Sequence, residues 1–304
     1  MYCLRAAAVA AGLCSSFIAQ LSAQIDYRNL DDDRPVVTED AYPVERYAFE
    51  FLAPYRFEAE SDGAQLHTTV PEVAYGLARN AQIGLKLPLA LVDEDTGTDQ
   101  GLAGLRLFGL YNFNTESRWL PALSLRADAS FPLGSLAGEG SRFALKAIAT
   151  RSWGRMRAHL NLARGFGSED ALSIAEPLSR WNASLAVDRT FFRSSILLIG
   201  ELALSQDIQN APTAVNASVG GRWQWTPTLV LDAGLTRRLR SDIGPDIALT
   251  VGLSHAFALR GLMPAGSPQA RRLSHVNESH DTTFDGRRCP ARQQPEHSHR
   301  PDPT

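Results

Sequence analysis

Between Tyr47 and Phe257 the sequence alternates apolar and polar residues with a period of two, and this pattern constrains the fold more than any other feature. From Tyr47 to Phe57 every second residue is apolar, whereas Glu50 and Arg56 fall between them. Successive side chains of a β-strand point to opposite faces, so one face of this segment contacts apolar surroundings along its whole length. The alternation predicts twelve strands, which cover residues 47–57, 65–75, 82–91, 105–113, 123–131, 143–150, 156–162, 181–188, 196–205, 215–223, 229–236 and 247–257.

A soluble β-sandwich also alternates, and two further features favour a membrane barrel over it. The polar face carries charged residues in the middle of nearly every strand, which suits a small wet lumen. The connections also alternate between short and long, as periplasmic turns and extracellular loops do in bacterial barrels. We therefore predict an all-β fold: a single closed antiparallel transmembrane β-barrel of about 12 strands over residues 44–257. The short connections are 78–80, 114–117, 152–154, 188–190 and 226–227, and the long ones are 59–64, 93–101, 134–142, 165–179, 206–211 and 237–245.

Aromatic residues cluster beside the short connections. Trp119, Trp153, Trp223 and Trp225 all lie there, and aromatic rings prefer the headgroup level of a membrane. The last strand ends on an aromatic residue, Phe257. The barrel-insertion machinery recognises the end of such a strand. The expected partners are therefore outer-membrane lipid and the insertion machinery.

Both ends of the chain read as segments outside the barrel. Residues 1–23 resemble a cleaved signal peptide, with Arg5 before a short apolar core and small residues at Ser22 and Ala23. The alternative is a buried helix of the mature fold. We expect residues 24–43 to form an N-terminal periplasmic segment and residues 258–304, rich in Arg, Pro and His, to form a disordered tail. The predicted location is the outer membrane of a Gram-negative cell.

Three stretches carry a resemblance to a known family. They are Arg34-Pro35-Val36-Val37-Thr38-Glu39-Asp40-Ala41; Pro71-Glu72-Val73-Ala74-Tyr75-Gly76-Leu77 with Lys86-Leu87-Pro88; and Gly234-Leu235-Thr236-Arg237-Arg238-Leu239 with Pro245-Asp246 and Gly252-Leu253-Ser254-His255-Ala256-Phe257. In this order they resemble the outer-membrane β-barrel transporter-like family named for a meta-pathway of phenol degradation. The resemblance implies an outer-membrane barrel with a transport role for small, aromatic compounds. The chain departs from the family by continuing past Phe257.

The sequence predicts neither an enzyme nor a cofactor. His67, His159 and His255 lie in no nucleophile motif such as G-x-S-x-G, so no catalytic residue is assigned. The acidic residues of loop 93–99 lack calcium-loop spacing, and we interpret them as a solvated loop rather than a metal site. The histidines of 275–299 are likewise interpreted as part of a solvated tail. A net charge of −3 gives no basic stripe for nucleic acid.

Charged residues of both signs on the polar face are the candidate functional residues. They could pair and plug a narrow barrel, or line a channel. The favoured function is an outer-membrane channel for passive uptake or export of a small-molecule solute, with aromatic or hydrophobic compounds among the candidates. The alternatives are a closed structural or loop-interaction barrel without transport, and a barrel enzyme. The lumen-lining candidates are Glu50, Arg56, Glu72, Lys86, Arg106, Arg126, Asp128, Lys146, Arg157, Asp188, Glu201, Arg222 and Asp232.

Four of these cations fall on neighbouring strands. Arg106, Arg126, Lys146 and Arg157 would give one wall of the lumen a basic patch, which predicts selectivity for anionic or aromatic-acid solutes. Neutralising Arg126 and Arg157 should therefore shift permeability towards cations.

Overall fold

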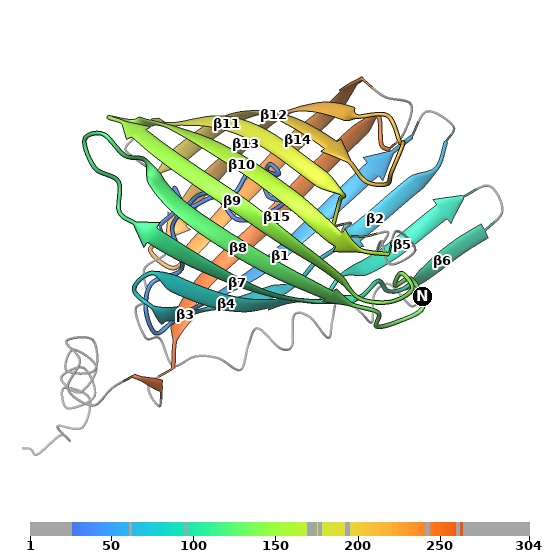
Figure 1. The fold of residues 1–304 in the computed structure, drawn as a ribbon, viewed down its shortest axis with the longest axis horizontal. Helices are drawn as coiled ribbons and strands as arrows, with labels where there is room; N and C mark the ends of the chain where they lie inside the picture. The colour runs from blue at the N-terminus through green and yellow to red at the C-terminus, as the bar shows by residue number, and fades with distance from the viewer. Residues whose placement is uncertain are drawn as a thin grey trace, which may run out of the picture. The chain divides into compact units, whose positions relative to one another are not determined.

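The computed structural model describes residues 26–60, 63–94, 97–168, 175, 178–191, 195–240, 244–259 and 262–263. One antiparallel sheet dominates it and closes on itself, because β15 pairs with β1 along twelve residues, from Ala258 opposite Ala48 to Ile247 opposite Ala59. Figure 1 shows the resulting barrel. The strands of the described chain are β1 (Ala48–Ala59), β2 (Gln65–Thr69), β3 (Glu72–Ala78), β4 (Ala81–Lys86), β5 (Leu89–Glu94), β6 (Gly97–Leu102), β7 (Leu105–Asn114), β8 (Ala122–Phe131), β9 (Arg142–Trp153), β10 (Met156–Gly167), β11 (Trp181–Phe191), β12 (Ile196–Gln206), β13 (Ala214–Thr226), β14 (Leu229–Arg240) and β15 (Ile247–Ala258).

These fifteen strands of the described chain make twelve crossings, because three crossings are each broken in two. Both β2 and β3 pair with β1, and the breaks fall at 70–71, 87–88 and 103–104. Proline has no N–H to give to a ladder, which accounts for a break at Pro71 and at Pro88. The N–H of Leu87 donates to the carbonyl of Pro71 over 2.9 Å, so these breaks lie at one level. The predicted closed barrel of twelve strands is confirmed.

One predicted loop is wrong. Residues 93–101 were expected to connect two strands, but β5 and β6 continue as a hairpin, with Glu94 opposite Gly97. The polar residues from Thr98 to Gln100 have no apolar face, so the alternation does not reveal a strand that backbone hydrogen bonds alone maintain. Of the strands in the described chain, only β5 pairs with β6. At the other edge of β6, the N–H of Leu136 donates to the carbonyl of Leu102 over 2.9 Å.

The outward face of the barrel is apolar, as contact with lipid requires. Leu107, Leu160 and Leu185 are among its exposed side chains, whereas the residues next to them along each strand are buried. The four tryptophans named above are exposed at the end of the barrel that carries the short turns, called here the short-turn end. The opposite end is called the long-loop end. No helix in the described part of the chain is long and apolar enough to cross a membrane.

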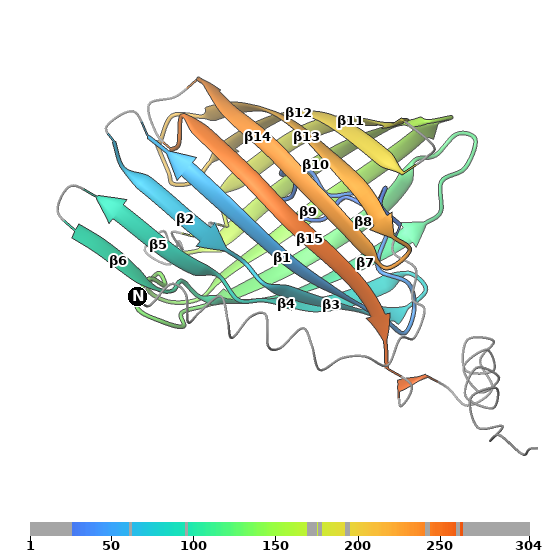
Figure 2. The ribbon, with the colours of Figure 1, turned by 180° about the vertical axis from the view of Figure 1, so that it is seen from behind.

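The N-terminal segment lies inside the barrel, where both views show it in dark blue (Figures 1 and 2). We call residues 30–42 the lumen segment. Leu30, Val36 and Ala41 are buried in it, and Ala41 packs against a small apolar cluster that includes Ile148. The expectation that residues 24–43 form a periplasmic segment therefore differs from the structure. The physical reason is charge pairing, since the acidic and basic side chains of this segment find partners on the inner wall.

The facing of β4 yields the first testable prediction. Leu85 is exposed on the outward face, and its neighbour Lys86 is buried inside. Leu85→Arg should destabilise the folded barrel by about 2–4 kcal/mol, as charged residues do near the middle of a bilayer. Leu85→Ala, which keeps the position apolar, is the matched control. Urea unfolding in lipid vesicles measures the difference. Equal stability of the arginine and alanine variants would place Leu85 away from lipid.

Candidate functional site: the occupied lumen

All thirteen lumen candidates lie on the inward face of the barrel. Eleven of them are buried, and Arg56 and Lys146 are partly buried. Arg56 pairs with Glu58 on its own strand, with Nε and Oε1 2.6 Å apart, and it lines the cavity at the long-loop end. The other twelve surround the lumen segment or the cavities on either side of it.

Five cations on adjacent strands form the basic wall, which we define as Lys86 on β4, Arg106 on β7, Arg126 on β8, Lys146 on β9 and Arg157 on β10. Lys86 stands directly opposite Arg106, and Arg126 stands directly opposite Lys146. Like charges in such positions destabilise a sheet unless anions lie between them. The arrangement therefore requires carboxylates from elsewhere in the chain.

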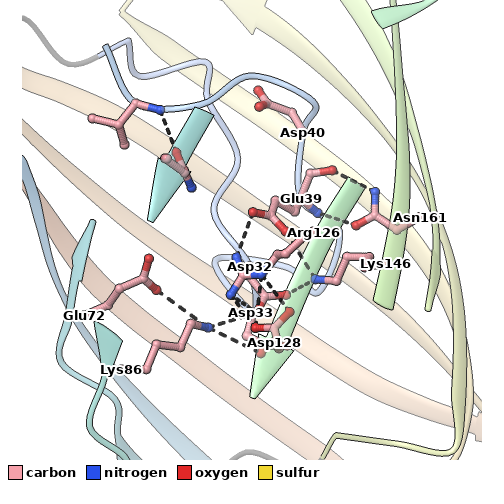
Figure 3. Close-up of polar contacts among 12 residues, drawn as sticks. Asp32, Asp33, Glu39, Asp40, Glu72, Lys86, Arg126, Asp128, Lys146 and Asn161 are labelled. Carbon is pink, nitrogen blue, oxygen red and sulfur yellow. Dashed lines mark hydrogen bonds and ion pairs between the residues drawn. The ribbon is translucent and has the colours of Figure 1, made fainter. Parts of the chain in front are cut away.

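Asp32 of the lumen segment supplies one of these carboxylates (Figure 3). Its Oδ2 lies 2.9 Å from Lys86 Nζ and 3.3 Å from Arg126 Nη2, and its Oδ1 contacts Lys146. Burial by itself raises the pKa of Asp32, but the attraction of the basic wall outweighs burial and holds this pKa well below its ordinary value. Asp32 is therefore ionised at neutral pH and acts as the central anchor of the segment.

Glu39 supplies a second carboxylate to two of these cations, Arg126 and Lys146. Its Oε1 lies 2.8 Å from Arg126 Nη1, and its Oε2 lies 3.3 Å from Lys146 Nζ. The backbone at Glu39 is fixed as well, because its N–H donates to Asn161 Oδ1 and its carbonyl accepts from Asn161 Nδ2, both over 2.8 Å. Arg126 also binds Asp128 on its own strand at 2.9 Å.

Asp40 extends the pairing to the last member of the basic wall. Its Oδ2 lies 3.1 Å from Arg157 Nη1, and Arg157 Nη2 lies 2.7 Å from Asp188 on β11. His159 joins this group, with Nε2 2.9 Å from Asp188 Oδ2 and Nδ1 3.0 Å from Thr150 Oγ1. These contacts give His159 a structural role in holding the wall.

The other side of the segment contacts strands β13 and β14. Arg34 Nη1 lies 3.2 Å from Asp232 on β14, and its Nη2 lies 2.8 Å from Asp31. Asp31 in turn lies 2.9 Å from Arg222 Nη2 on β13. The segment therefore presents only anions to the basic wall, whereas on this side it presents both a cation, Arg34, and an anion, Asp31.

Two contacts tie the middle of the segment to β11 and β12. The backbone N–H of Thr38 donates to Glu201 Oε2 over 2.6 Å, and Thr38 Oγ1 lies 2.8 Å from Ser184 Oγ. Pro35 lies against two glycines that face each other on β13 and β14, Gly220 and Gly234. Polar anchors and this glycine hollow together fix the position of the segment.

The segment separates two cavities. One of about 350 Å³ lies at the short-turn end, where Ala48, Gln224 and Ala256 line it. The other, of about 420 Å³, lies at the long-loop end, and Asp32 and Arg34 belong to its lining. A solute in one cavity therefore meets the lumen segment before it reaches the other.

Sequence reasoning found the wall but missed the segment. The signal that could have found it is the acidic run at 31–33 and the pair at 39–40, which precede the first strand in a chain with several cations on its lumen face. In the described residues, no group of three His, Cys, Asp or Glu side chains could hold a metal ion. The predicted signal 1–23, Asp95 and the histidines of 275–299 lie outside the described residues.

Solved structures similar to this chain include outer-membrane channels and porins. The chain is similar to the COG4313 outer membrane channel from Pseudomonas putida F1, at 14% identity and a TM-score of 0.54 over 75% of this chain and 100% of that one. It is also similar to the KdgM porin, at 13% identity and a TM-score of 0.46 over 68% of this chain and 99% of that one. For the NanC porin, the identity is 11% and the TM-score 0.46 over 68% and 98%.

The comparisons of the sequence with protein families and with curated proteins found no match. No protein-family model matches the chain, so the resemblance to the meta-pathway family is not confirmed. No curated protein matches it significantly. At such low identity the structural similarity shows the fold alone: this chain has the closed β-barrel fold of an outer-membrane channel.

Proposed function

We propose that this protein is an outer-membrane channel for the passive passage of small solutes, and that its lumen segment closes the passage. The observation that carries the proposal is the chemistry of the contacts around the segment. Asp32, Glu39 and Asp40 reach the wall through ion pairs and hydrogen bonds, and the segment lies between two cavities.

Polar contacts of this kind suit a removable plug. Water and dissolved ions can replace hydrogen bonds and ion pairs, so that the net free energy of each contact is modest. An apolar core has no such substitute. The apolar outward face and the aromatic girdle support a location in the outer membrane, with the short-turn end in the periplasm. The resemblance of three stretches to the meta-pathway family supports a transport role.

The basic wall supports a preference for anionic solutes, aromatic acids among them. Field lines concentrate in a narrow tube of low dielectric, so cations on the wall raise the local concentration of anions. Lys146 is the most informative member, because its ion pairs are with the segment residues Asp32 and Glu39. Neutralising Arg126 or Arg157 would also remove the partner of a wall carboxylate, Asp128 or Asp188.

Lys146→Gln should therefore shift the selectivity of open channels towards cations. Reversal potentials in asymmetric salt, recorded from single channels in planar bilayers, measure this shift. Arg238→Gln is the control, since Arg238 pairs with Asp246 near the long-loop end and contacts no residue of the segment in the described chain. An unchanged reversal potential with Lys146→Gln would remove the basic wall from the conduction path. A closed structural barrel predicts that wild type carries no current at all.

A further inference from the structure

We propose that the basic wall binds small solutes that carry two carboxylates, and that such a solute competes with Asp32 and Glu39 for the same site. This inference rests on the proposed function and names the solute class of that channel. In the closed state, the lumen segment occupies the site with its own side chains, in the way that a ligand would.

The two segment carboxylates share their partners. The two terminal nitrogens of Arg126 divide between them, with Nη1 2.8 Å from Glu39 and Nη2 3.3 Å from Asp32. Lys146 Nζ also contacts both carboxylates, and Figure 3 shows this convergence. Because one guanidinium reaches both groups, the carboxylates lie close together although they are seven positions apart in the chain. A guanidinium can donate to two carboxylates at once, because its five N–H groups point in fixed directions around one plane.

The wall requires these anions when the segment leaves. Of the wall's own carboxylates, Glu72 lies 3.6 Å from Lys86 and Asp128 lies 2.9 Å from Arg126. Lys146 would lose the two carboxylates with which it pairs in the closed state. Removing one partner of a buried ion pair is strongly unfavourable, so a solute that replaces both segment carboxylates stabilises the open state more than water does.

The site can be reached from the long-loop end. Lys86 and Asp32 belong to the lining of the cavity of about 420 Å³ at that end. Lys146, Arg106 and Asp32 line an adjoining space of about 70 Å³, together with residues near the long loops such as Leu178. Both segment carboxylates that the solute would replace contact the one guanidinium of Arg126, which favours a short dicarboxylate over a long one.

The experiment measures how fast the segment becomes exposed. Val36 is buried in the closed state, and Val36→Cys, in a background with Cys3, Cys14 and Cys289 replaced by serine, gives a site that a charged maleimide reaches only when the segment moves. Purified full-length protein in lipid vesicles is labelled with the maleimide in the presence of one added solute. The solutes are succinate, its monoamide succinamate, and sulfate, all at equal ionic strength. We expect succinate to accelerate labelling in a saturable manner, and the monoamide and sulfate to have much weaker effects.

Lys146→Gln tests the site itself. The loss of a charged hydrogen-bonding partner should raise the succinate concentration for half-maximal effect about tenfold or more. Arg238→Gln should not change it. Equal acceleration by succinate, succinamate and sulfate would overturn the inference, as would an unchanged succinate response in Lys146→Gln. A channel that conducts but ignores succinate would refute this inference alone, whereas a barrel that never conducts would refute the proposed function.

Discussion

Replacement of Gly234 by valine should open the channel. A Cβ atom at Gly234 would overlap the carbonyl oxygen of Pro35 and lie 3.0 Å from its carbonyl carbon. Gly220, directly opposite on β13, leaves no more room, because a Cβ there would already lie 3.0 Å from the ring of Pro35. Valine is a good strand former, so the wall should persist and the lumen segment should move.

The expected size of this effect follows from the energy of overpacking. Crowding a packed site costs about 1–3 kcal/mol, which corresponds to about a 5- to 150-fold rise in the ratio of open to closed channels. Open probability in planar bilayers measures the change. Gly200→Val is the matched control. Gly200 lies on β12, which pairs with β13, and a Cβ there meets no atom within 4 Å. Equal open probabilities in the two variants would show that displacing Pro35 does not open the passage.

The strands could be predicted from the sequence because each strand carries its own signal. The outward residues from Ile83 to Leu91 form one apolar row, so a single crossing was predicted where the structure has β4 and β5. The break at Pro88 leaves the parity of the side chains unchanged, and periodicity therefore does not reveal it. The hairpin of β5 and β6 was missed because its residues from Thr98 to Gln100 are polar on both faces.

The charged wall of the site could be predicted from the sequence, but the lumen segment that contacts it could not. The parity of each strand placed the thirteen charged residues inside, since a residue and its second neighbour share a face. The lumen segment has no period, and its partners are distant: Asp32 pairs with Lys86, 54 positions away, and Arg34 bonds to Ser254, 220 positions away. Once the register is known, the pairing of Arg126 opposite Lys146 shows that an anion is missing from the wall.

A covalent tether between the segment and the wall should hold the channel closed. Thr38 Oγ1 and Ser184 Oγ lie 2.8 Å apart in the lumen. The C–S bonds of cysteine are longer than these C–O bonds, so two sulfurs in these positions would approach more closely, towards the distance of about 2.05 Å in a disulfide. Thr38→Cys with Ser184→Cys, in a background with Cys3, Cys14 and Cys289 replaced by serine, should therefore cross-link residue 38 to β11 under oxidising conditions. Either cysteine alone is the matched control, because it changes the same side chain without forming the tether.

The single-channel current of this double-cysteine protein, recorded from one membrane before and after a reductant is added, tests the central claim most directly. If the lumen segment is the gate, the oxidised protein carries almost no current and the reductant restores the openings of the single-cysteine controls. Equal currents before and after reduction, with the disulfide verified by mass spectrometry, would contradict the account, because solutes would then pass a segment that cannot leave.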